Sequence, residues 1–382
     1  MQRQYILKQI DRHFRVNPVI ALLGPRQCGK TTVARQYIQT IGKIPPQNYF
    51  DLENPRDIAR LADPMLALSQ LSGLIVIDEI QSMDALFPCL RVLVDNPMLK
   101  QQRYLILGSA SEVLLKGSAE TLAGRISHLE MTPFSYPEVG DWQKLWIRGG
   151  FPKAYLAHSA SDSQTWRKTF IKTFLEKDIP RLGIQIPFEN LRRFWMMLAH
   201  RHGYTLNASD IARSLGLSGK TIQHYADILT GTYMIRQLKP WFENIDKRQV
   251  KAAKIFFRDS GIFHTLSDIQ NFSALQLHPK LGNSWECFAL EQIIRYHQAD
   301  SEDCYFWSTH QGAEIDLLLM QNNQRVGFEI KYNSAPTLSK SMRIADEDLK
   351  LDKFFVIYPG DVDYALSKKI KVVGLKNYLS QD

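Results

Sequence analysis

Residues 24–31 of the chain read GPRQCGKT and fit the phosphate-binding pattern G-x-x-x-x-G-K-[ST]. The two glycines let the backbone turn its N–H groups toward nucleotide phosphates, Lys30 supplies a positive charge, and Thr31 supplies a hydroxyl for Mg²⁺. The apolar run VIALL before the loop predicts a buried strand, and KTTVARQYI after it predicts a helix whose N-terminus faces the anion. The expected nucleotide contacts are Gly24, Pro25, Arg26, Gln27, Cys28, Gly29, Lys30, Thr31 and Thr32.

Two further apolar stretches end in polar residues. Residues 74–80 read LIVIDEI, and behind a phosphate loop we expect Asp78 to hold Mg²⁺ through water and Glu79 to polarise the attacking water. The stretch RYLILGSAS places Ser109 after a third strand, where ligands bind in an open α/β sheet. Ser109 either orients the lytic water or acts as an ordinary helix cap.

Composition indicates a globular chain of two or three domains, because its 382 residues are 45% hydrophobic and 23% charged. The start, MQRQYILKQIDRHF, lacks the apolar core of a signal peptide, and no run is long and apolar enough to span a bilayer. The four cysteines show no paired spacing, which argues against disulfides or a zinc site. We therefore expect a cytoplasmic protein without a membrane partner. Cys28 is either an acidic thiol near a helix N-terminus or, as we prefer, a small filler residue.

Positive charge is concentrated in the middle of the chain. Residues 151–260 contain 18 Lys and Arg against nine Asp and Glu, a net charge of +9. The preceding residues carry a net charge of +3, and the following residues carry −4. This distribution predicts a polyanionic partner bound by the middle segment, with a solvated basic surface as the alternative.

Strand and helix patterns alternate in the first part of the chain. After the phosphate-loop unit come QNYFDL, a helix-prone stretch, LIVIDEI, a helix around FPCLRVLVD, RYLILGS, a helical turn and ISHLEMTPF. This order predicts a parallel, three-layer α/β ATPase core. The stretch GGFP at residues 149–152 begins a new unit, with helical patterns at 165–182 and 188–200.

Within the basic segment, residues 205–230 read TLNASDIARSLGLSGKTIQHYADILT and predict a helix-turn-helix. Ala212 permits close helix approach, Gly216 forms the turn, and Ile222 is the buried aliphatic residue. Strands expected in MIRQLKPW and KAAKIFFRDSG, around a loop with Lys and Arg, extend the pattern to a winged helix. Such modules bind DNA or, alternatively, protein. The side chains expected to meet a DNA groove are Ser218, Lys220, Thr221, Gln223 and His224.

The acidic C-terminal segment contains a second group of candidate residues. Asp316 begins the predicted strand GAEIDLLLM, and Glu329 and Lys331 project from one face of the next strand, RVGFEIKYN. Carboxylates on adjacent strands can hold a divalent cation, and a nearby lysine can stabilise charge or orient water. Glu286 lies in the helix predicted from SWECFALEQII. The pattern is typical of a metal-dependent phosphodiesterase, with a solvated sheet face as the alternative.

These features together resemble the prokaryotic AAA+ ATP-binding proteins that end in a PD-(D/E)xK-like domain of unknown function. The markers cover nearly the whole chain and are GPRQCGKTT, IVIDEIQ, ILGSAS, TLAGR, GGFP, the winged helix, KIFFRDSG, GAEIDLLL and FEIK. The resemblance implies an α/β fold class with four parts. These are an AAA+ three-layer P-loop ATPase core (1–148), a helical lid or linker (149–200), a winged helix-turn-helix (201–262), and a C-terminal α/β PD-(D/E)xK nuclease-like domain (263–382).

The resemblance also implies roles for individual residues. Asp78 and Glu79 correspond to the Walker B pair, Ser109 to the first sensor, and Arg125 to an arginine finger or sensor that reaches a neighbouring subunit's nucleotide. An arginine of this kind implies a homo-oligomeric ring, often a hexamer, whereas a surface salt bridge is the alternative. The nuclease signature corresponds to Glu286, Asp316, Glu329 and Lys331, with Asp316 and Glu329 as metal ligands.

The sequence therefore predicts a DNA-associated ATPase that uses ATP and Mg²⁺ to remodel or translocate DNA. Branched DNA such as a four-way Holliday junction is included by analogy with related rings. One alternative is an ATP-gated, Mg²⁺-dependent DNA nuclease with a role in defence. The other alternative is a signalling switch that depends on ATP and binds protein without acting on DNA.

Overall fold

The structure is a computed structural model that describes residues 3–111, 122–243 and 247–380. The helical turn expected after RYLILGS lies outside the described residues, as does part of the loop expected between the two strands of the winged helix. The chain divides into two compact units. Unit 1 comprises Met1–Pro133, Glu176–Gln185 and Gly231–Tyr233, and unit 2 comprises Phe134–Leu175, Ile186–Thr230 and Met234–Asp382.

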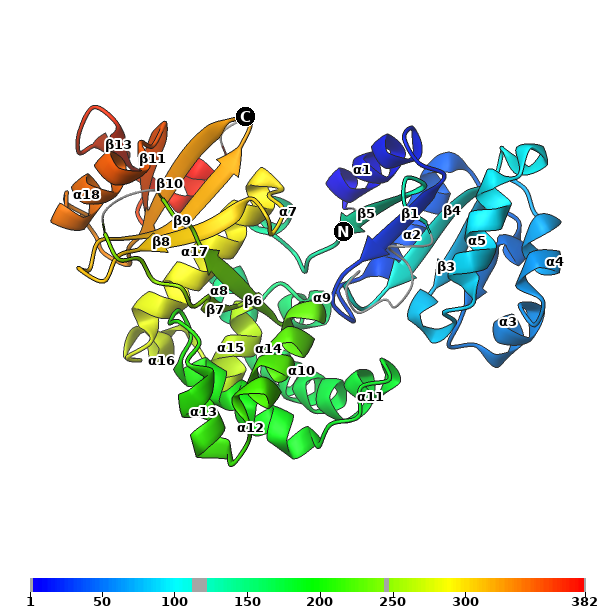
Figure 1. The fold of residues 1–382 in the computed structure, drawn as a ribbon, viewed down its shortest axis with the longest axis horizontal. Coiled ribbons are helices and arrows are strands. Elements are labelled where there is room, and N and C mark those ends of the chain that lie inside the picture. The colour runs from blue at the N-terminus through cyan, green and yellow to red at the C-terminus, as the bar shows by residue number, and fades with distance from the viewer. Residues whose placement is uncertain (1–2, 112–121, 244–246, 381–382) are drawn as a thin grey trace. The chain divides into compact units, whose positions relative to one another are not determined.

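Unit 1 is built around a five-stranded parallel sheet in the order β2-β3-β4-β1-β5 (Figure 1). Its first strand and helix are joined by the phosphate loop, as the sequence predicted. The predicted α/β fold with a parallel sheet is therefore confirmed. The elements of unit 1 are α1 Gln4–Phe14, β1 Val19–Leu23, α2 Lys30–Ile41, β2 Tyr49–Asp51, α3 Pro55–Arg60, α4 Pro64–Ser69, β3 Leu74–Asp78, α5 Leu86–Asp95, β4 Arg103–Gly108, β5 Ile126–Glu130 and α11 Ile179–Arg181.

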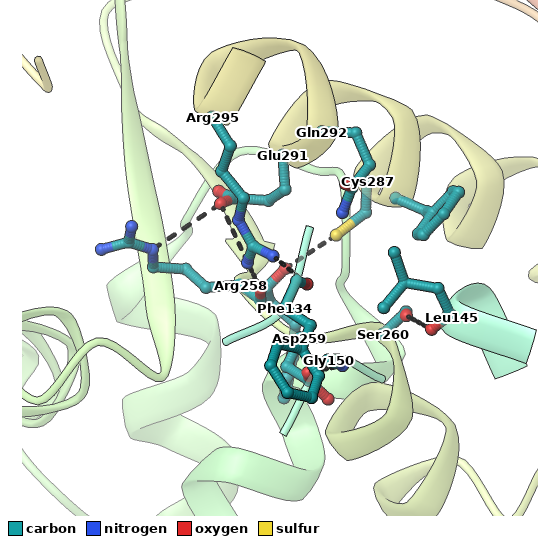
Figure 2. A pocket seen from close by; sticks show the side chains of 12 residues that line it. Phe134, Leu145, Gly150, Arg258, Asp259, Ser260, Cys287, Glu291, Gln292 and Arg295 are labelled. Carbon is teal, nitrogen blue, oxygen red and sulfur yellow. Dashed lines mark hydrogen bonds and ion pairs between the residues drawn. The ribbon is translucent and has the colours of Figure 1, made fainter. Parts of the chain in front are cut away.

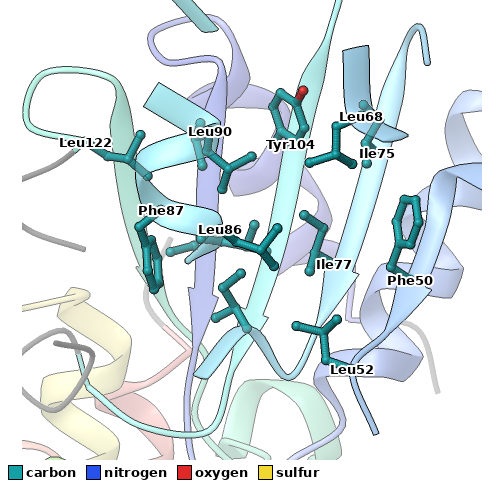
Figure 3. Close-up of a cluster of buried hydrophobic side chains, with 14 of the residues drawn as sticks. Phe50, Leu52, Leu68, Ile75, Ile77, Leu86, Phe87, Leu90, Tyr104 and Leu122 are labelled. Carbon is teal, nitrogen blue, oxygen red and sulfur yellow. The ribbon is translucent and has the colours of Figure 1, made fainter. Parts of the chain in front are cut away.

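The central strands of this sheet are buried on both faces because alternate side chains enter different hydrophobic cores. On β1, Ala21 packs in the cluster that contains Leu86 and Leu90 of α5. Figure 3 shows these two leucines in the cluster. The neighbour of Ala21, Ile20, packs in the opposite cluster with residues of α1 and α2, including Val33. Continuous apolar strands such as VIALL are typical of parallel sheets that are covered by helices on both sides. The result is the three-layer arrangement that the sequence predicted.

Unit 2 combines a helical region with an eight-stranded mixed sheet in the order β12-β13-β11-β10-β9-β8-β6-β7. Within the described ranges, no helix has both the length and the apolar character required to cross a membrane. The elements are α7 Tyr136–Val139, α8 Trp142–Arg148, α9 Pro152–Tyr155, α10 Ala160–Thr173, α12 Phe188–His200, α13 Ala208–Leu215, α14 Gly219–Gly231, β6 Ile235–Pro240, β7 Lys254–Phe257, α15 Ser260–Leu266, α16 Phe272–Gln276, α17 Leu281–His297, β8 Cys304–Ser308, β9 Glu314–Gln321, β10 Gln324–Ile330, α18 Lys340–Leu349, β11 Lys353–Tyr358, β12 Tyr364–Ala365, β13 Ile370–Gly374 and α19 Leu375–Tyr378.

Helices α13 and α14 form at the positions expected for the helix-turn-helix. Gly216 between them adopts a left-handed φ of 67°, which glycine tolerates without a steric penalty. Ala212 and Ile222 are buried, as that pattern requires. The expected strands β6 and β7 follow and pair antiparallel. Strand β6 also pairs in parallel with β8, so this hairpin is part of the C-terminal sheet, an arrangement that the sequence did not predict.

The hairpin of β9 and β10 positions the C-terminal candidate residues. The strands pair antiparallel from Gln321 with Gln324 to Leu317 with Phe328. The two residues of the connecting turn, Asn322 and Asn323, have φ values of 52° and 57°. Positive φ at both central positions is the requirement of a type I′ turn, and asparagine tolerates it better than most residues. The short polar stretch QNNQ therefore sets the register of the strand pair.

A buried histidine makes the stability of unit 2 sensitive to acid. The ring of His264 contacts the Ile147 carbonyl through Nδ1 at 3.2 Å and the Ser284 hydroxyl through Nε2 at 2.7 Å. Burial lowers the pKa of His264 from 6.5 to about 3. Between these values the unfolded chain binds a proton that the folded chain does not, so stability is lost as the pH falls through this window.

We therefore expect His264→Gln to flatten the acid dependence of thermal unfolding. The glutamine amide can contact the same two oxygens but does not titrate. The unfolding midpoint of the variant should fall less between about pH 7 and pH 5 than that of the wild type. The matched control is His200→Gln, because His200 is exposed. Equal slopes for wild type and His264→Gln would contradict the expectation.

Candidate nucleotide site and C-terminal carboxylate cluster

The phosphate loop takes its shape from close backbone packing. A Cβ on Gly24 would lie 2.1 Å from the carbonyl oxygen of Met131, which no larger residue can accommodate without a backbone shift. Gly29, which directly precedes α2, has a φ of 102°. Gln27 also adopts a left-handed φ, at 62°. The glycines of the motif therefore occupy positions where a side chain is excluded or the backbone is strained.

Lys30, the first residue of α2, is buried at 6% exposure. Its Nζ donates hydrogen bonds to the carbonyls of Gly24 at 2.9 Å and Pro25 at 3.0 Å. The loop carbonyls thus hold the ammonium group against the loop. This arrangement is suited to binding the phosphates of a nucleotide.

Thr31 and Asp78, the two residues expected to bind Mg²⁺ in this unit, lie in direct contact. The Thr31 hydroxyl donates to Asp78 Oδ2 at 2.7 Å, and the Tyr49 hydroxyl donates to the same oxygen at 3.0 Å. Burial raises the pKa of Asp78, although both hydroxyl groups stabilise its ionised form. A threonine hydroxyl beside a carboxylate at the end of a strand fits Mg²⁺, which prefers oxygen ligands. These two residues would hold the ion next to the phosphates.

Glu79 lies at the carboxyl end of β3 in a left-handed conformation, with φ at 58°. The Ser109 hydroxyl, which follows β4, donates to Glu79 Oε2 at 3.1 Å. The Gln81 amide donates to the same carboxylate oxygen. The carboxylate is therefore oriented by two side chains at the edge of the sheet where ligands bind, which suits a group that polarises water.

Arg26, one of the four residues between the glycines of the phosphate loop, takes part in an ion-pair network within unit 1. Its guanidinium lies 2.6 Å from Glu53 and 3.1 Å from Asp178, and Glu53 also pairs with Arg181 at 2.6 Å. Asp178 and Arg181 belong to a segment about 150 residues later in the chain. Nothing in the local sequence signals this proximity, so Glu53, Asp178 and Arg181 were not predicted. Tyr49 and Gln81 were also missed, although Gln81 lies only two residues after Glu79.

Cys28 does not have an acidic thiol. Its side chain is completely buried, and its sulfur lies 3.6 Å from the carbonyl oxygen of Met131. Burial raises the pKa of the Cys28 thiol, which overrides the nearby positive charges. The acidic-thiol interpretation is therefore wrong, because desolvation disfavours the thiolate. The structure agrees with the preferred interpretation of Cys28 as a small filler residue.

Arg125 is held by an exposed carboxylate of the same unit. Its Nε lies 2.6 Å from Asp95 Oδ1, and its Nη2 lies 2.8 Å from Asp95 Oδ2. The hydrogen bond from Arg125 holds the pKa of Asp95 below its usual value. This two-bond geometry is the surface salt bridge that the sequence left open as the alternative. A role for Arg125 at a neighbouring subunit's nucleotide stays a prediction.

In unit 2, the C-terminal candidate residues gather around the β9–β10 hairpin. Extending the observed register by one pair places Glu329 opposite Asp316. Asp316 Oδ2 accepts a hydrogen bond from the Ile330 N–H at 2.7 Å, and Lys331 Nζ lies 2.6 Å from Glu329 Oε1. The carboxylates of Asp316 and Glu329 are both buried. Glu286 of α17 interacts electrostatically with Asp316 and Lys331. The structure thus brings together all four predicted residues.

Two further residues complete this cluster and were missed by the sequence. Lys254, at the start of β7, lies 3.9 Å from Glu286 Oε1 and makes a short hydrogen-bonded ion pair with Glu314. Burial, together with repulsion from Asp316, raises the pKa of Glu286 well above its usual value and that of Glu329 to about 8. Among residues 3–111, 122–243 and 247–380, no group of three or more His, Cys, Asp or Glu residues is arranged to hold a metal ion.

A separate small pocket in unit 2 is lined by a buried carboxylate and by arginines. Glu291 Oε1 lies 2.6 Å from Arg236 Nε, and Glu291 Oε2 lies 3.7 Å from both Arg258 and Arg295. Figure 2 shows Arg258 and Arg295 reaching toward Glu291. Burial opposes ionisation of Glu291, but the arginines lower its pKa to about 2. This charge network joins β6, the end of β7 and α17, and it was not predicted.

Three protein families match successive parts of the chain. Residues 16–140 match an AAA domain, residues 139–273 match a domain of unknown function (DUF8612), and residues 281–378 match another domain of unknown function (DUF4143). The AAA match covers the parallel sheet and the phosphate loop. The first unit is accordingly a P-loop ATPase domain of the AAA class.

The chain is 45% identical over 375 residues to "Uncharacterized protein Rv2008c" of Mycobacterium tuberculosis and to "Uncharacterized protein Mb2031c" of Mycobacterium bovis. Each alignment covers 98% of this chain and 83% of the relative. The chain therefore belongs to the same family as these two mycobacterial proteins.

Two solved structures show weaker similarity. The Walker-type ATPase PABY2304 of Pyrococcus abyssi is 13% identical with a TM-score of 0.43, and the alignment covers 70% of this chain and 95% of that one. The ORC1 protein of Aeropyrum pernix, solved in complex with DNA, is 13% identical with a TM-score of 0.33, with coverage of 70% and 92%.

We expect Glu79→Gln to separate nucleotide binding from hydrolysis. The amide keeps the size of the side chain but cannot accept a proton, so hydrolysis should fall by about 100-fold or more while ATP binding is retained. Phosphate release and the binding of a fluorescent ATP analogue measure the two effects. The matched control is Asp84→Asn, an equivalent change at a nearby exposed carboxylate. Loss of binding in parallel with hydrolysis would contradict this assignment.

Proposed function

We propose that this protein is a DNA-associated ATPase that hydrolyses ATP with Mg²⁺ and uses the energy to remodel or translocate DNA. The observation that carries the ATPase part is the pair of contacts at the carboxyl ends of the strands, Thr31 with Asp78 and Ser109 with Glu79. Together with Lys30, these contacts support a metal-binding pair and a water-polarising carboxylate beside one phosphate loop.

Each residue of this site has a distinct role in the proposal. The loop from Gly24 to Thr32 binds the phosphates, with Lys30 as its positive charge. Thr31 and Asp78 hold Mg²⁺, which supplies charge neutralisation at the phosphates when it is bound. Glu79 accepts a proton from the attacking water, and Ser109 orients the Glu79 carboxylate.

The DNA part of the proposal is supported by charge and by the helix pair α13 and α14. The net charge of +9 lies in residues 151–260, which contain both helices. Lys220 and His224 are exposed on α14, and the Ser218 hydroxyl accepts a hydrogen bond from the Thr221 N–H at 3.0 Å at the start of the helix. Gln223 instead donates to Asp227 at 2.9 Å. Exposed polar side chains at the start of a second helix match the way in which helix-turn-helix proteins contact a groove.

The C-terminal cluster supports a second candidate function, an ATP-gated nuclease. Buried carboxylates of Asp316 and Glu329 on paired strands, beside Lys331, match the residue types of a PD-(D/E)xK-like site. In this version the basic middle segment holds the DNA, and the C-terminal cluster acts on it. The third version is a protein-binding switch, in which ATP turnover is indifferent to DNA.

The DNA assignment predicts that DNA stimulates ATP hydrolysis. Phosphate release should be measured with Mg²⁺ without DNA and with single-stranded, duplex and four-way-junction DNA, using Lys30→Ala as the blank. We expect stimulation by at least one DNA shape and a weaker response in Lys220→Ala, which removes about one phosphate contact. The matched control is Lys168→Ala, which removes an exposed lysine of α10. A rate of ATP hydrolysis that is the same with and without each DNA would favour the protein-binding switch.

The ring assignment predicts unequal effects for the two partners of the Arg125 ion pair. If Arg125 completes a neighbouring subunit's site, Arg125→Ala should reduce hydrolysis by about 1,000-fold with ATP binding intact, as loss of an arginine finger does. Asp95→Ala should leave hydrolysis near the wild-type rate, because it only frees the arginine. Steady-state hydrolysis and the mass of the assembly with ATP measure both effects. Small, equal losses of hydrolysis rate in both variants would show that Arg125 serves only in a surface salt bridge with Asp95.

A further inference from the structure

Lys254 is the most enclosed cation of the C-terminal cluster. It is 7% exposed and lies at the start of the edge strand β7, with the carboxylate of Glu286 at 3.9 Å and that of Glu314 in a short ion pair. Burial alone would lower the pKa of Lys254, but the carboxylates of Glu286, Asp316 and Glu314 raise it above its ordinary value. Lys254 therefore places an ammonium group between the carboxylates of Glu286 and Glu314.

The two lysines of the cluster differ in their freedom to move away. The Lys331 side chain is 46% exposed, so it can reach solvent when a ligand approaches Glu329. The Lys254 side chain is 9% exposed, and its Nζ also lies 5.3 Å from the ring centroid of Phe306. Its backbone bridges to Thr205, outside the strand pair with β6. The Lys254 side chain is thus held in place by the residues around it, whereas the Lys331 side chain lies at the solvent-exposed edge of the cluster.

Two buried carboxylate oxygens of the cluster remain without hydrogen bonds in the described part of the chain. They are Glu286 Oε1 and Glu329 Oε2. A buried carboxylate oxygen normally has a donor or a cation beside it, because its desolvation is otherwise uncompensated. Among the described residues, the cation that pairs with Glu286 Oε1 is Lys254, at 3.9 Å. The cluster therefore has ligand atoms of the kind that a divalent cation uses, together with an ammonium group that competes for them.

We propose that Lys254 is a built-in cation that takes the place of a divalent metal ion in the C-terminal cluster. The ammonium group neutralises Glu286 and Glu314, so the cluster binds a divalent cation only weakly while Lys254 is present. The ammonium group explains how four carboxylates can lie close together without a metal ion to neutralise them. It also agrees with the finding that, among the described residues, no three His, Cys, Asp or Glu side chains are arranged to hold a metal ion. The arrangement makes Lys254, which lies on the second strand after the helix-turn-helix, the residue that decides whether the cluster is a metal site.

The test measures binding of Mn²⁺ alone to the full chain without nucleotide, using the electron paramagnetic resonance signal of free Mn²⁺. Every protein carries Asp78→Asn, which removes the metal ligand of the phosphate-loop site. The compared proteins are this parent, Lys254→Met and the neutral but polar Lys254→Gln. Lys247→Met is the matched control, because Lys247 pairs with Asp348 at 2.6 Å elsewhere in unit 2. Circular dichroism confirms that each variant is folded.

We expect the parent and Lys247→Met to bind Mn²⁺ weakly, and Lys254→Met or Lys254→Gln to bind it at least about tenfold more tightly. Adding Asp316→Asn to either Lys254 variant should remove the gain, which locates the ion at the cluster. Unchanged affinity in folded Lys254 variants would overturn the proposal. So would tight Mn²⁺ binding by the parent that Asp316→Asn abolishes, a result that requires no Lys254 variant to fold. Neither result depends on whether the protein acts on DNA.

Discussion

The contact of Gly24 with the backbone of Met131 is the constraint on which the nucleotide site depends. A Cβ at this position would lie 2.1 Å from the Met131 carbonyl oxygen. The loop can therefore pack against this backbone only if residue 24 is glycine. In the packed loop Lys30 donates a hydrogen bond to the Gly24 carbonyl, and α2 begins directly after Gly29, so a helix N-terminus suited to an anion follows the loop. Because β1 lies between β4 and β5, the same contact places the loop at the edge where β3 and β4 also end.

The nucleotide site and the C-terminal carboxylate cluster compensate the desolvation of their buried carboxylates in different ways. In unit 1, Asp78 receives hydrogen bonds from Thr31 and Tyr49, which are neutral donors that a metal ion can replace or join. In unit 2, the carboxylates of Glu286 and Glu329 face the ammonium groups of Lys254 and Lys331. A hydroxyl leaves the net negative charge of its partner in place, whereas an ammonium cancels it. The first arrangement favours a cation, and the second supplies one.

Local sequence predicted those parts of the sites that lie on neighbouring elements. Asp316 and Glu329 could be paired because the turn QNNQ joins their strands directly, and a two-residue turn fixes the register. Lys254 could not be predicted as their neighbour, because its position depends on the parallel pairing of β6 with β8. Arg26 and Asp178 are also distant in sequence, and nothing in either segment indicates their contact. The sequence left open an acidic thiol at Cys28 as the less favoured interpretation, and the packed loop rules it out because burial raises the pKa of the thiol.

The sequence by itself determined the succession of strands and helices along the chain in unit 1. It also determined the phosphate loop and the polar residues that follow the strands. These features follow from hydrophobic periodicity and from the conformations that glycine permits, both of which act over a few residues. The tertiary structure alone decided which polar groups meet across the sheets, including Tyr49 with Asp78, Arg26 with Asp178, and Lys254 with Glu286. Ionic contacts of this kind depend on strand order and burial, which arise only when distant segments pack together.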